Sequence, residues 1–227
     1  LVDFKNINDN SNYHVIELSS FQLESAPSFY SHISILLNIS HDHLDRYVTI
    51  DNYIHAKKKI LNNNKESYNI ISIDDNYCKE IFFSSNHLNN IPISASKPIK
   101  NGIFFIDNKI HDHYFFDKKI ISINKISQSL TGKFNLQNIL AAYTVSQILR
   151  LDIKIFLKIV GTFIGLPHRL ETIINNNNLE VINNSKATNL DSNIKSISNY
   201  KNIYLIIGGR AKEKNFSSLI DFKKNII

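Results

Sequence analysis

Short apolar runs alternate with longer amphipathic stretches along the chain. Three of the runs read as strands, at residues 13–20, 32–40 and 68–74. The second, "HISILLNIS", is too apolar for a strand with one solvated face, so we expect it near the centre of a sheet. Together with the stretches between them, these runs predict an α/β fold with a central, mainly parallel sheet flanked by helices.

Helical spacing of apolar residues is clearest at residues 49–64, 76–83 and 132–151. A further helix is expected over 152–166, starting after Asp152, because aspartate is a preferred helix N-cap.

Residues 101–123 have a different character, since strand-like runs there flank the turn pair Asp107-Asn108. We expect an antiparallel hairpin at an edge of the sheet.

Gly165 and Pro167 interrupt the pattern, and we place a domain boundary there, between residues 1–165 and 166–227. Beyond the boundary the strand and helix rhythm is expected to restart. The predicted order is strand 179–185, helix 189–200, strand 202–209 and helix 216–227. Two such units are few for a doubly wound domain, and the chain has no Met and opens at Leu1. We therefore expect it to be a fragment of a longer protein.

Composition narrows the class of protein. The chain is 43% hydrophobic and 20% charged, as in a globular domain, and no apolar run has the length of a membrane span. The net charge of +6 is scattered, with no dense basic stripe, so nucleic-acid binding is not expected. Cys78 is the single cysteine, which excludes an internal disulfide and a Cys/His zinc site. These features fit a cytoplasmic protein that does not insert into a membrane.

Candidate chemistry gathers where strands end. Glu17 lies at the end of the first predicted strand, and "HDHLDRY" follows the second, while Lys57 and Tyr53 are one turn apart on the next helix. Ligands in open α/β sheets collect beyond the carboxyl ends of strands, so Glu17, His43 and Lys57 can converge on one crevice. The same residues also have explanations without function. Glu17 can be a helix cap or a surface residue, His43 can form a turn, and Lys57 can belong to a solvated run of lysines. From residues alone, the prediction is an α/β domain with a candidate cation site.

Seven motifs occur in an order that resembles the Mur ligase family. They are "ELSSFQLE", "NISHDHLDRY", "YIHAKKKI", "GKFNLQNILAA", "GLPHRLE", "NNSKATN" and "GGRAKEKNF". The resemblance implies that residues 1–165 are most of a central ATP-binding domain. Residues 166–227 would then be the start of a Rossmann-like, amino-acid-binding domain. A phosphate-binding P-loop is missing, because Gly132-Lys133 is followed by Phe134 and lacks the upstream glycine.

The reaction implied by the resemblance is ADP-forming amide synthesis. ATP would phosphorylate the carboxylate of UDP-N-acetylmuramoyl-L-alanine, and D-glutamate would attack the acyl phosphate. Two Mg²⁺ ions and a monomeric parent enzyme are expected. The isolated chain is expected to be inactive. The alternatives are another Mur ligase, a folylpolyglutamate synthase relative, or a non-catalytic remnant.

The resemblance also assigns roles to individual residues. Glu17 would hold the Mg²⁺ that bridges the ATP phosphates, and His43 a second Mg²⁺. Lys57 would react with CO₂ to give a carbamate that ligates metal, and Ser19 would contact substrate. The remaining assignments are Asn135 and Asn138 at the adenine, His168 and Arg169 at the hinge with Arg169 on the γ-phosphate, Lys186 at the phosphates, and Thr188 and Lys212 at the carboxylates of D-glutamate.

Two positions depart from the family pattern. Asn184 and Asn215 stand where aspartate is usual, and each removes a negative charge. Altered nucleotide or metal affinity is the expected consequence. Asp42, Asp45 and Arg46 are interpreted as a frame for the His43 loop.

Overall fold

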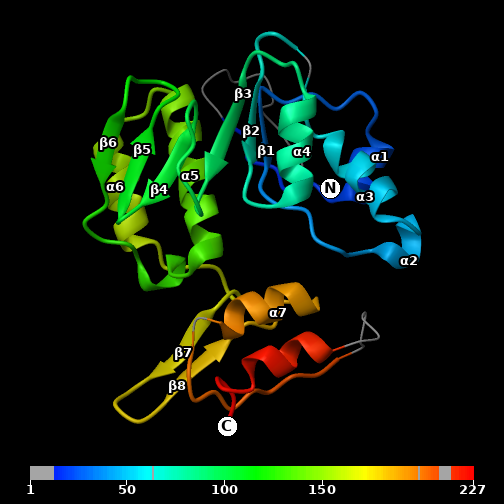
Figure 1. Ribbon diagram of the computed structural model, residues 1–227. Helices are drawn as coiled ribbons and strands as arrows, with labels where there is room; N and C mark the ends of the chain where they lie inside the picture. The colour runs from blue at the N-terminus through cyan, green and yellow to red at the C-terminus, as the bar shows by residue number, and fades with distance from the viewer. Residues whose placement is uncertain (1–12, 63, 199, 210–215) are drawn as a thin grey trace, which may run out of the picture.

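The fold is built on one six-stranded sheet, seen in a computed structural model that describes residues 13–227 except 63, 199 and 210–215 (Figure 1). The strand order is β1-β2-β3-β4-β5-β6. The first four strands pair in parallel, and β5 and β6 extend the sheet antiparallel. The strands are β1 (Ile33–Leu36), β2 (Tyr68–Ser72), β3 (Asn90–Ser94), β4 (Ile103–Ile106), β5 (Lys109–Asp112) and β6 (Lys119–Ser122). The predicted fold class is confirmed.

Helices cover both faces of this sheet. On one side lie α1 (Ser20–Ser25), α2 (Leu44–Tyr47), α3 (Ile50–Lys58) and α4 (Asn76–Ser84), and on the other α5 (Lys133–Ile148) and α6 (Ile153–Thr162). Neighbouring residues of β2 show the division, because Ile70 belongs to the core under α5 and Ile71 to the core under α3 and α4. Successive side chains of a strand point to opposite faces, so an uninterrupted apolar run suits a sheet buried on both sides.

Several predicted elements are confirmed. The helices expected at 49–64, 76–83, 132–151 and 152–166 form as α3 to α6, and the Asp152 carboxylate caps α6 by accepting from the backbone N of Lys154 at 2.9 Å. The hairpin β4–β5 turns at Asp107 and Asn108, whose φ angles of 50° and 56° suit a tight turn. Beyond the hairpin, β6 is the edge strand on this side of the sheet.

Two expectations near the N-terminus are wrong. Residues 13–19 form no strand, and Val15 is 98% exposed. The run at 32–40 gives β1, which is an edge strand and not a central one. A strand needs a hydrogen-bonded neighbour, and no described segment pairs with the outer edge of β1.

A second, smaller lobe follows α6. It contains the antiparallel pair β7 (Glu171–Asn175) and β8 (Glu180–Asn183), then α7 (Leu190–Ile197) and the 3₁₀ helix η2 (Ser217–Phe222). The strand at 179–185 and the helix at 189–200 were predicted, and they form as β8 and α7. The sequence did not predict β7, because the asparagines that follow it are typical of a loop. In the structure they form the β7–β8 turn, where Asn176 Oδ1 accepts from the backbone N of Asn178 and of Leu179.

The last two predicted elements of this lobe are wrong. Residues 202–209 contribute only an isolated bridge at Ile203, and residues 216–227 give a short 3₁₀ helix in place of an α-helix. Ile206 is 98% exposed, so this apolar stretch has no strand neighbour among the described residues.

In the described part of the chain, no helix combines the length and the apolar character needed to cross a membrane.

A buried carboxylate ties the hairpin to α5. Asp112 is fully buried, and its Oδ2 accepts from the hydroxyl of Tyr143 at 2.8 Å while Oδ1 accepts from the backbone N of Tyr114 and of Phe115. Burial and the Asp112 carboxylate raise the pKa of the Tyr143 phenol.

Replacing Tyr143 by Phe removes a donor from this carboxylate while preserving the ring. We expect the free energy of unfolding to fall by about 1–3 kcal/mol, since a buried acceptor loses its partner. Urea unfolding followed by circular dichroism measures the change. Tyr204→Phe, on a side chain that is 77% exposed, is the control and should leave the unfolding midpoint unchanged. An unchanged midpoint in Tyr143→Phe would contradict the assignment.

Candidate functional site

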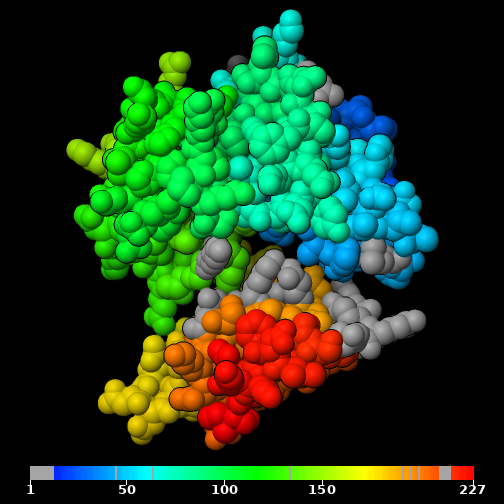
Figure 2. All heavy atoms as spheres, in the orientation of Figure 1, coloured from blue at the N-terminus to red at the C-terminus, as the bar shows by residue number. Residues whose placement is uncertain are grey.

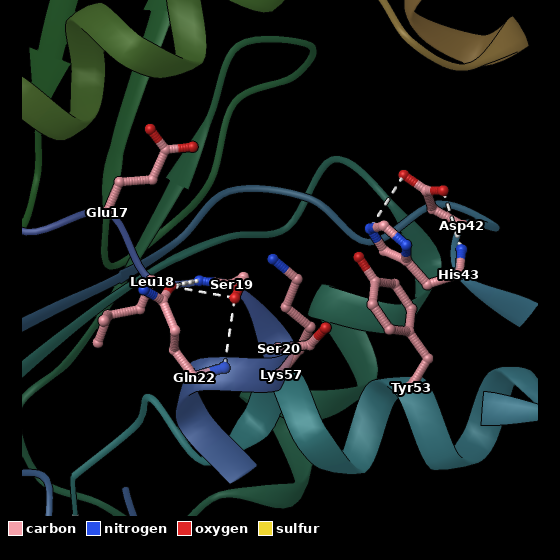
Figure 3. Close-up of a pocket in the computed structure, with 9 residues that line it drawn as sticks. All are labelled: Glu17, Leu18, Ser19, Ser20, Gln22, Asp42, His43, Tyr53 and Lys57. Atoms are coloured by element: carbon pink, nitrogen blue, oxygen red, sulfur yellow. Dashed lines mark hydrogen bonds and ion pairs between the residues drawn. The ribbon is translucent and has the colours of Figure 1, made fainter. Parts of the chain in front are cut away.

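A polar cavity of about 390 Å³ lies beside the start of α1, the loop after β1 and the buried face of α3 (Figure 3). Four predicted site residues meet on it: Glu17, Ser19, His43 and Lys57. The other lining residues are Leu18, Ser20, Gln22, Asp42 and Tyr53. The convergence expected from strand ends and helix spacing therefore occurs, although Glu17 reaches it from an extended segment and not from a strand.

A capping box fixes the Ser19 wall of the cavity. The backbone N of Gln22 donates to Ser19 Oγ at 3.2 Å, and the backbone N of Ser19 donates to Gln22 Oε1 at 2.8 Å. Reciprocal caps of this kind satisfy backbone donors at a helix start and set the entry angle of the chain. Glu17 lies two residues upstream on an exposed segment, and its carboxylate is open to solvent.

His43 is held on the opposite wall. Its backbone has φ of 55°, a left-handed conformation that is uncommon outside glycine. The Asp42 carboxylate accepts from the backbone N of His43 at 2.9 Å, and the His43 ring packs edge-on against Phe21 at 4.9 Å between centroids. Tyr53 flanks the ring from α3 at 6.2 Å. These contacts aim the imidazole at the cavity.

Lys57 projects from α3 into the space between Glu17 on one side and Asp42 and His43 on the other (Figure 3). Its Nζ lies 5.9 Å from the centroid of the Tyr53 ring. Burial lowers the pKa of the Lys57 amine, and the negative charges of Glu17 and Asp42 partly offset that effect. Lys58, the last residue of α3, and the C-cap Lys59 are exposed, so Lys57 is the lysine of the run that lines the cavity.

A second cavity of about 500 Å³ lies between the sheet domain and the C-terminal lobe. Figure 2 shows the orange and red C-terminal lobe below the green and cyan body of the molecule. Four predicted residues line this second cavity: Asn135 and Asn138 from α5, Arg169 after α6, and Lys186 after β8. The Asn138 amide donates to Asn135 Oδ1 at 3.1 Å, and Asn135 donates to the carbonyl of Thr131 at 2.9 Å.

Two predicted residues, His168 and Thr188, line neither cavity. The backbone carbonyl of His168 accepts from Lys186 N at 3.1 Å, but the imidazole bonds Asn183 at 2.8 Å and lines neither cavity. Thr188 is exposed and also lines neither. Lys212 lies outside the described residues, as does the departure at Asn215.

The loop after β1 serves both cavities. Asn38 and Ser40 line the second one, while Asp42 and His43 line the first. Sequence reasoning missed Asn38 and Ser40. The available signal was their polarity at the end of an otherwise apolar strand, where α/β sheets bind ligands.

The donor set fits a nucleotide-bound Mg²⁺ better than an enclosed ion. Among the described residues there is no group of three His, Cys, Asp or Glu side chains that could hold a metal by itself. The first cavity nevertheless offers two carboxylates, from Glu17 and Asp42, and the imidazole of His43. Mg²⁺ commonly takes one or two protein carboxylates and completes its shell with phosphates and water, so these residues fit it.

Comparison with known proteins points to one family. The pattern described as the Mur ligase middle domain matches residues 2–146. The chain is 43% identical over 204 residues to UDP-N-acetylmuramoylalanine--D-glutamate ligase of Rickettsia prowazekii (strain Madrid E), covering 88% of this chain and 45% of that protein. Against the protein of the same name from Clostridioides difficile (strain 630), identity is 37% over 215 residues, or 94% and 47% of the two chains. The chain thus spans about half the length of the curated relatives it matches.

A solved structure shares the fold. MurF ligase from Thermotoga maritima, in complex with ADP, aligns with a TM-score of 0.53 at 16% identity, over 79% of this chain and 40% of that one. At this identity the likeness concerns the fold alone.

The electrostatics of the first cavity give a directional test. The charge of Glu17 stabilises the ammonium form of Lys57, so Glu17→Gln should lower the pKa of the Lys57 amine further below its usual range. NMR titration of the lysine side-chain signals measures it. Glu66→Gln, at an exposed position before β2, is the control and should leave that pKa in place. A rise in the Lys57 pKa on removing Glu17 would contradict the geometry.

Proposed function

This chain belongs to the Mur ligase family, and on that premise we propose that it supplies much of the active site of an enzyme that adds D-glutamate to UDP-N-acetylmuramoyl-L-alanine with cleavage of ATP to ADP. The observation that carries the proposal is the convergence of Glu17, Ser19, His43 and Lys57 on one cavity. The names of the relatives at 43% and 37% identity support the choice of substrates.

The proposed chemistry converts a poor electrophile into a good one. An oxygen of the substrate carboxylate attacks the γ-phosphorus of ATP, the bond to the bridging oxygen breaks, and ADP leaves. The neutral amine of D-glutamate then attacks the carbonyl carbon of the acyl phosphate. Phosphate leaves with its bonding electrons, and the nitrogen gives up a proton to complete the amide. Both steps crowd negative groups together, which explains a site with basic side chains on its walls.

Glu17, His43 and a modified Lys57 are the proposed ligands of two Mg²⁺ ions. When bound, Mg²⁺ neutralises phosphate charge and polarises the reacting oxygens. Ser19, fixed by its capping box, would orient the muramoyl substrate beside them.

Carbamylation of Lys57 is part of the proposal. The unprotonated amine attacks CO₂, a nitrogen–carbon bond forms, and loss of a proton leaves an anionic carbamate oxygen. The position of Lys57 supports this, since the side chain is half-buried on the cavity wall and burial lowers the pKa of its amine. A lysine in that state becomes an oxygen donor facing His43 instead of a competing cation.

The second cavity is the proposed nucleotide pocket. Asn135 and Asn138 would contact adenine, and Arg169 and Lys186 would contact phosphates, Arg169 with its planar fork at the γ-phosphate. A solved neighbour with ADP bound supports a nucleotide in this fold. His168 as a nucleotide contact, and Thr188 and Lys212 as ligands of the D-glutamate carboxylates, stay predictions from the motifs.

The division into a central domain at 1–165 and an amino-acid-binding domain from 166 also stays a prediction. We further propose a cytoplasmic, monomeric enzyme of peptidoglycan precursor synthesis. The name of its relatives, UDP-N-acetylmuramoylalanine--D-glutamate ligase, supports the place in that synthesis.

In an active enzyme that contains this chain, Lys57→Ala should abolish ligation. Short carboxylates added to the assay should restore part of the activity, because they can replace the carbamate oxygens as anionic donors. D-Glutamate-dependent phosphate release measures both effects. Lys58→Ala, at the exposed neighbour on the same helix, is the control and should retain activity. Activity that survives Lys57→Ala without added carboxylate would show that the amine is dispensable.

The 227-residue chain by itself should not turn over ATP with D-glutamate and UDP-N-acetylmuramoyl-L-alanine. Its sequence has no glycine-rich loop of the type that cradles ATP phosphates. Phosphate release by the purified chain is the measurement, with a reaction lacking D-glutamate as background. Release above background would contradict this expectation.

A further inference from the structure

Two motif residues that the proposed chemistry does not use meet across the lobes. The side-chain amide of Asn189, from "SKATN", donates to Asp42 Oδ2 at 3.2 Å, although the residues are 147 positions apart. We propose that this contact is a latch through which docking of the C-terminal lobe positions His43. Asp42 and Asn189 are then positioning residues, and the inference rests on the proposed function because His43 is taken as a working group.

Asp42 divides its two oxygens between the loop and the lobe. Oδ1 accepts from the backbone N of His43 at 2.9 Å, and Oδ2 accepts from Asn189 and lies 3.6 Å from His43 Nε2. His43 has left-handed backbone, which costs a non-glycine residue free energy and persists only where neighbours hold it. The carboxylate that holds this backbone is the one that the C-terminal lobe holds from the other side.

Asn189 is preorganised to donate. Its Oδ1 caps α7 by accepting from the backbone N of Ser192 at 2.9 Å, so its amide hydrogens face away from the helix. Its backbone carbonyl accepts from the Asn193 side chain at 2.8 Å, which fixes the turn. Little side-chain entropy is left to lose when the amide meets Asp42.

The other end of α7 is tied to the hinge. Asn184 donates from Nδ2 to Ser196 Oγ at 2.7 Å and accepts at Oδ1 from the backbone N of Leu170 at 3.2 Å. Ser196 Oγ donates its hydrogen to the carbonyl of Ser192, so toward Asn184 it acts as an acceptor. The amide at 184, where the family pattern has aspartate, thus supplies a donor that an ionised carboxylate lacks.

A continuous polar connection therefore runs from the hinge, through α7, to the loop that carries His43. Asn184, Ser192, Ser196 and Asn189 all line the second cavity, and Asp42 lines the first. Any ligand that draws the lobe onto the second cavity acts through this connection on His43. Such coupling orders the site for chemistry only after the lobe has docked.

The sharpest variant is Asn189→Asp. Aspartate caps a helix as well as asparagine does, so α7 is retained, but the donor becomes a carboxylate that faces Asp42. The exchanged pair Asp42→Asn with Asn189→Asp restores one donor and one acceptor with reversed direction. Asn178→Asp is the matched control, because it adds the same charge to the same lobe at the exposed β7–β8 turn.

Lobe docking can be measured on the 227-residue chain by fluorescence energy transfer between dyes at Glu80→Cys and Asp221→Cys, both exposed. Cys78 is buried and burial raises the pKa of its thiol, so labelling is confined to the new cysteines. Asn189→Asp should reduce the ratio of docked to undocked molecules by about tenfold, as expected for loss of a hydrogen bond to a charged group. The exchanged pair should recover the wild-type ratio, and Asn178→Asp should keep it. An unchanged ratio in Asn189→Asp, or no recovery in the exchanged pair, would overturn the latch.

The consequence for His43 is measured in an active enzyme that contains this chain. Asn189→Asp should lower kcat by about tenfold because His43 is no longer positioned, and the exchanged pair should recover kcat. The KM for ATP should rise as well, since Asn189 lines the proposed nucleotide pocket. Unchanged kcat in an otherwise active enzyme overturns the role in positioning. An inactive wild type counts against the proposed function instead, and the energy-transfer result then decides the latch independently.

Discussion

Parallel pairing of β1, β2 and β3 is the constraint on which both cavities depend. It brings the carboxyl ends of the strands to one edge of the sheet, where the next residues of the chain leave the core. The pairing is possible because the central strands are buried on both faces, with Ile70 and Ile71 in opposite cores. The loop after β1 therefore runs along that edge. Asn38 and Ser40 of this loop line the second cavity, and Asp42 and His43 line the first.

The first cavity combines burial and charge in a way that a purely structural site has no need of. A lysine amine is placed on the wall among carboxylates, but at a depth where its charged form is disfavoured. An ordinary salt bridge would hold the ammonium close to one carboxylate. Here the Lys57 Nζ lies 5.9 Å from the centroid of the Tyr53 ring, and Glu17 and Asp42 act on the amine as charges in the surroundings. That arrangement suits an amine that loses its proton and then reacts as a nucleophile, as the proposed carbamylation of Lys57 requires.

How much the sequence could predict depended on whether a feature was local. Helix spacing and the Asp152 cap are local signals, and α3 and α6 form where they were expected. The convergence of His43 and Lys57 followed from the rule about strand ends. The place of β1 at the sheet edge could not be predicted, because apolarity reports burial and not which strands are neighbours. For residues 202–209 the pattern was apolar enough for a strand, but a strand forms only with a partner, and Ile206 has none among the described residues. The contact between Asp42 and Asn189 joins residues 147 positions apart, and no local pattern encodes it.

On the proposed function, these two cavities form parts of a D-glutamate-adding ligase. Transfer of radiolabelled glutamate to UDP-N-acetylmuramoyl-L-alanine, by an active enzyme that contains this chain, tests it most directly. We expect an ATP-dependent product with the D-enantiomer, little or none with L-glutamate, and loss of the product in His43→Ala. Absence of product with D-glutamate, or equal transfer of another amino acid, would contradict it.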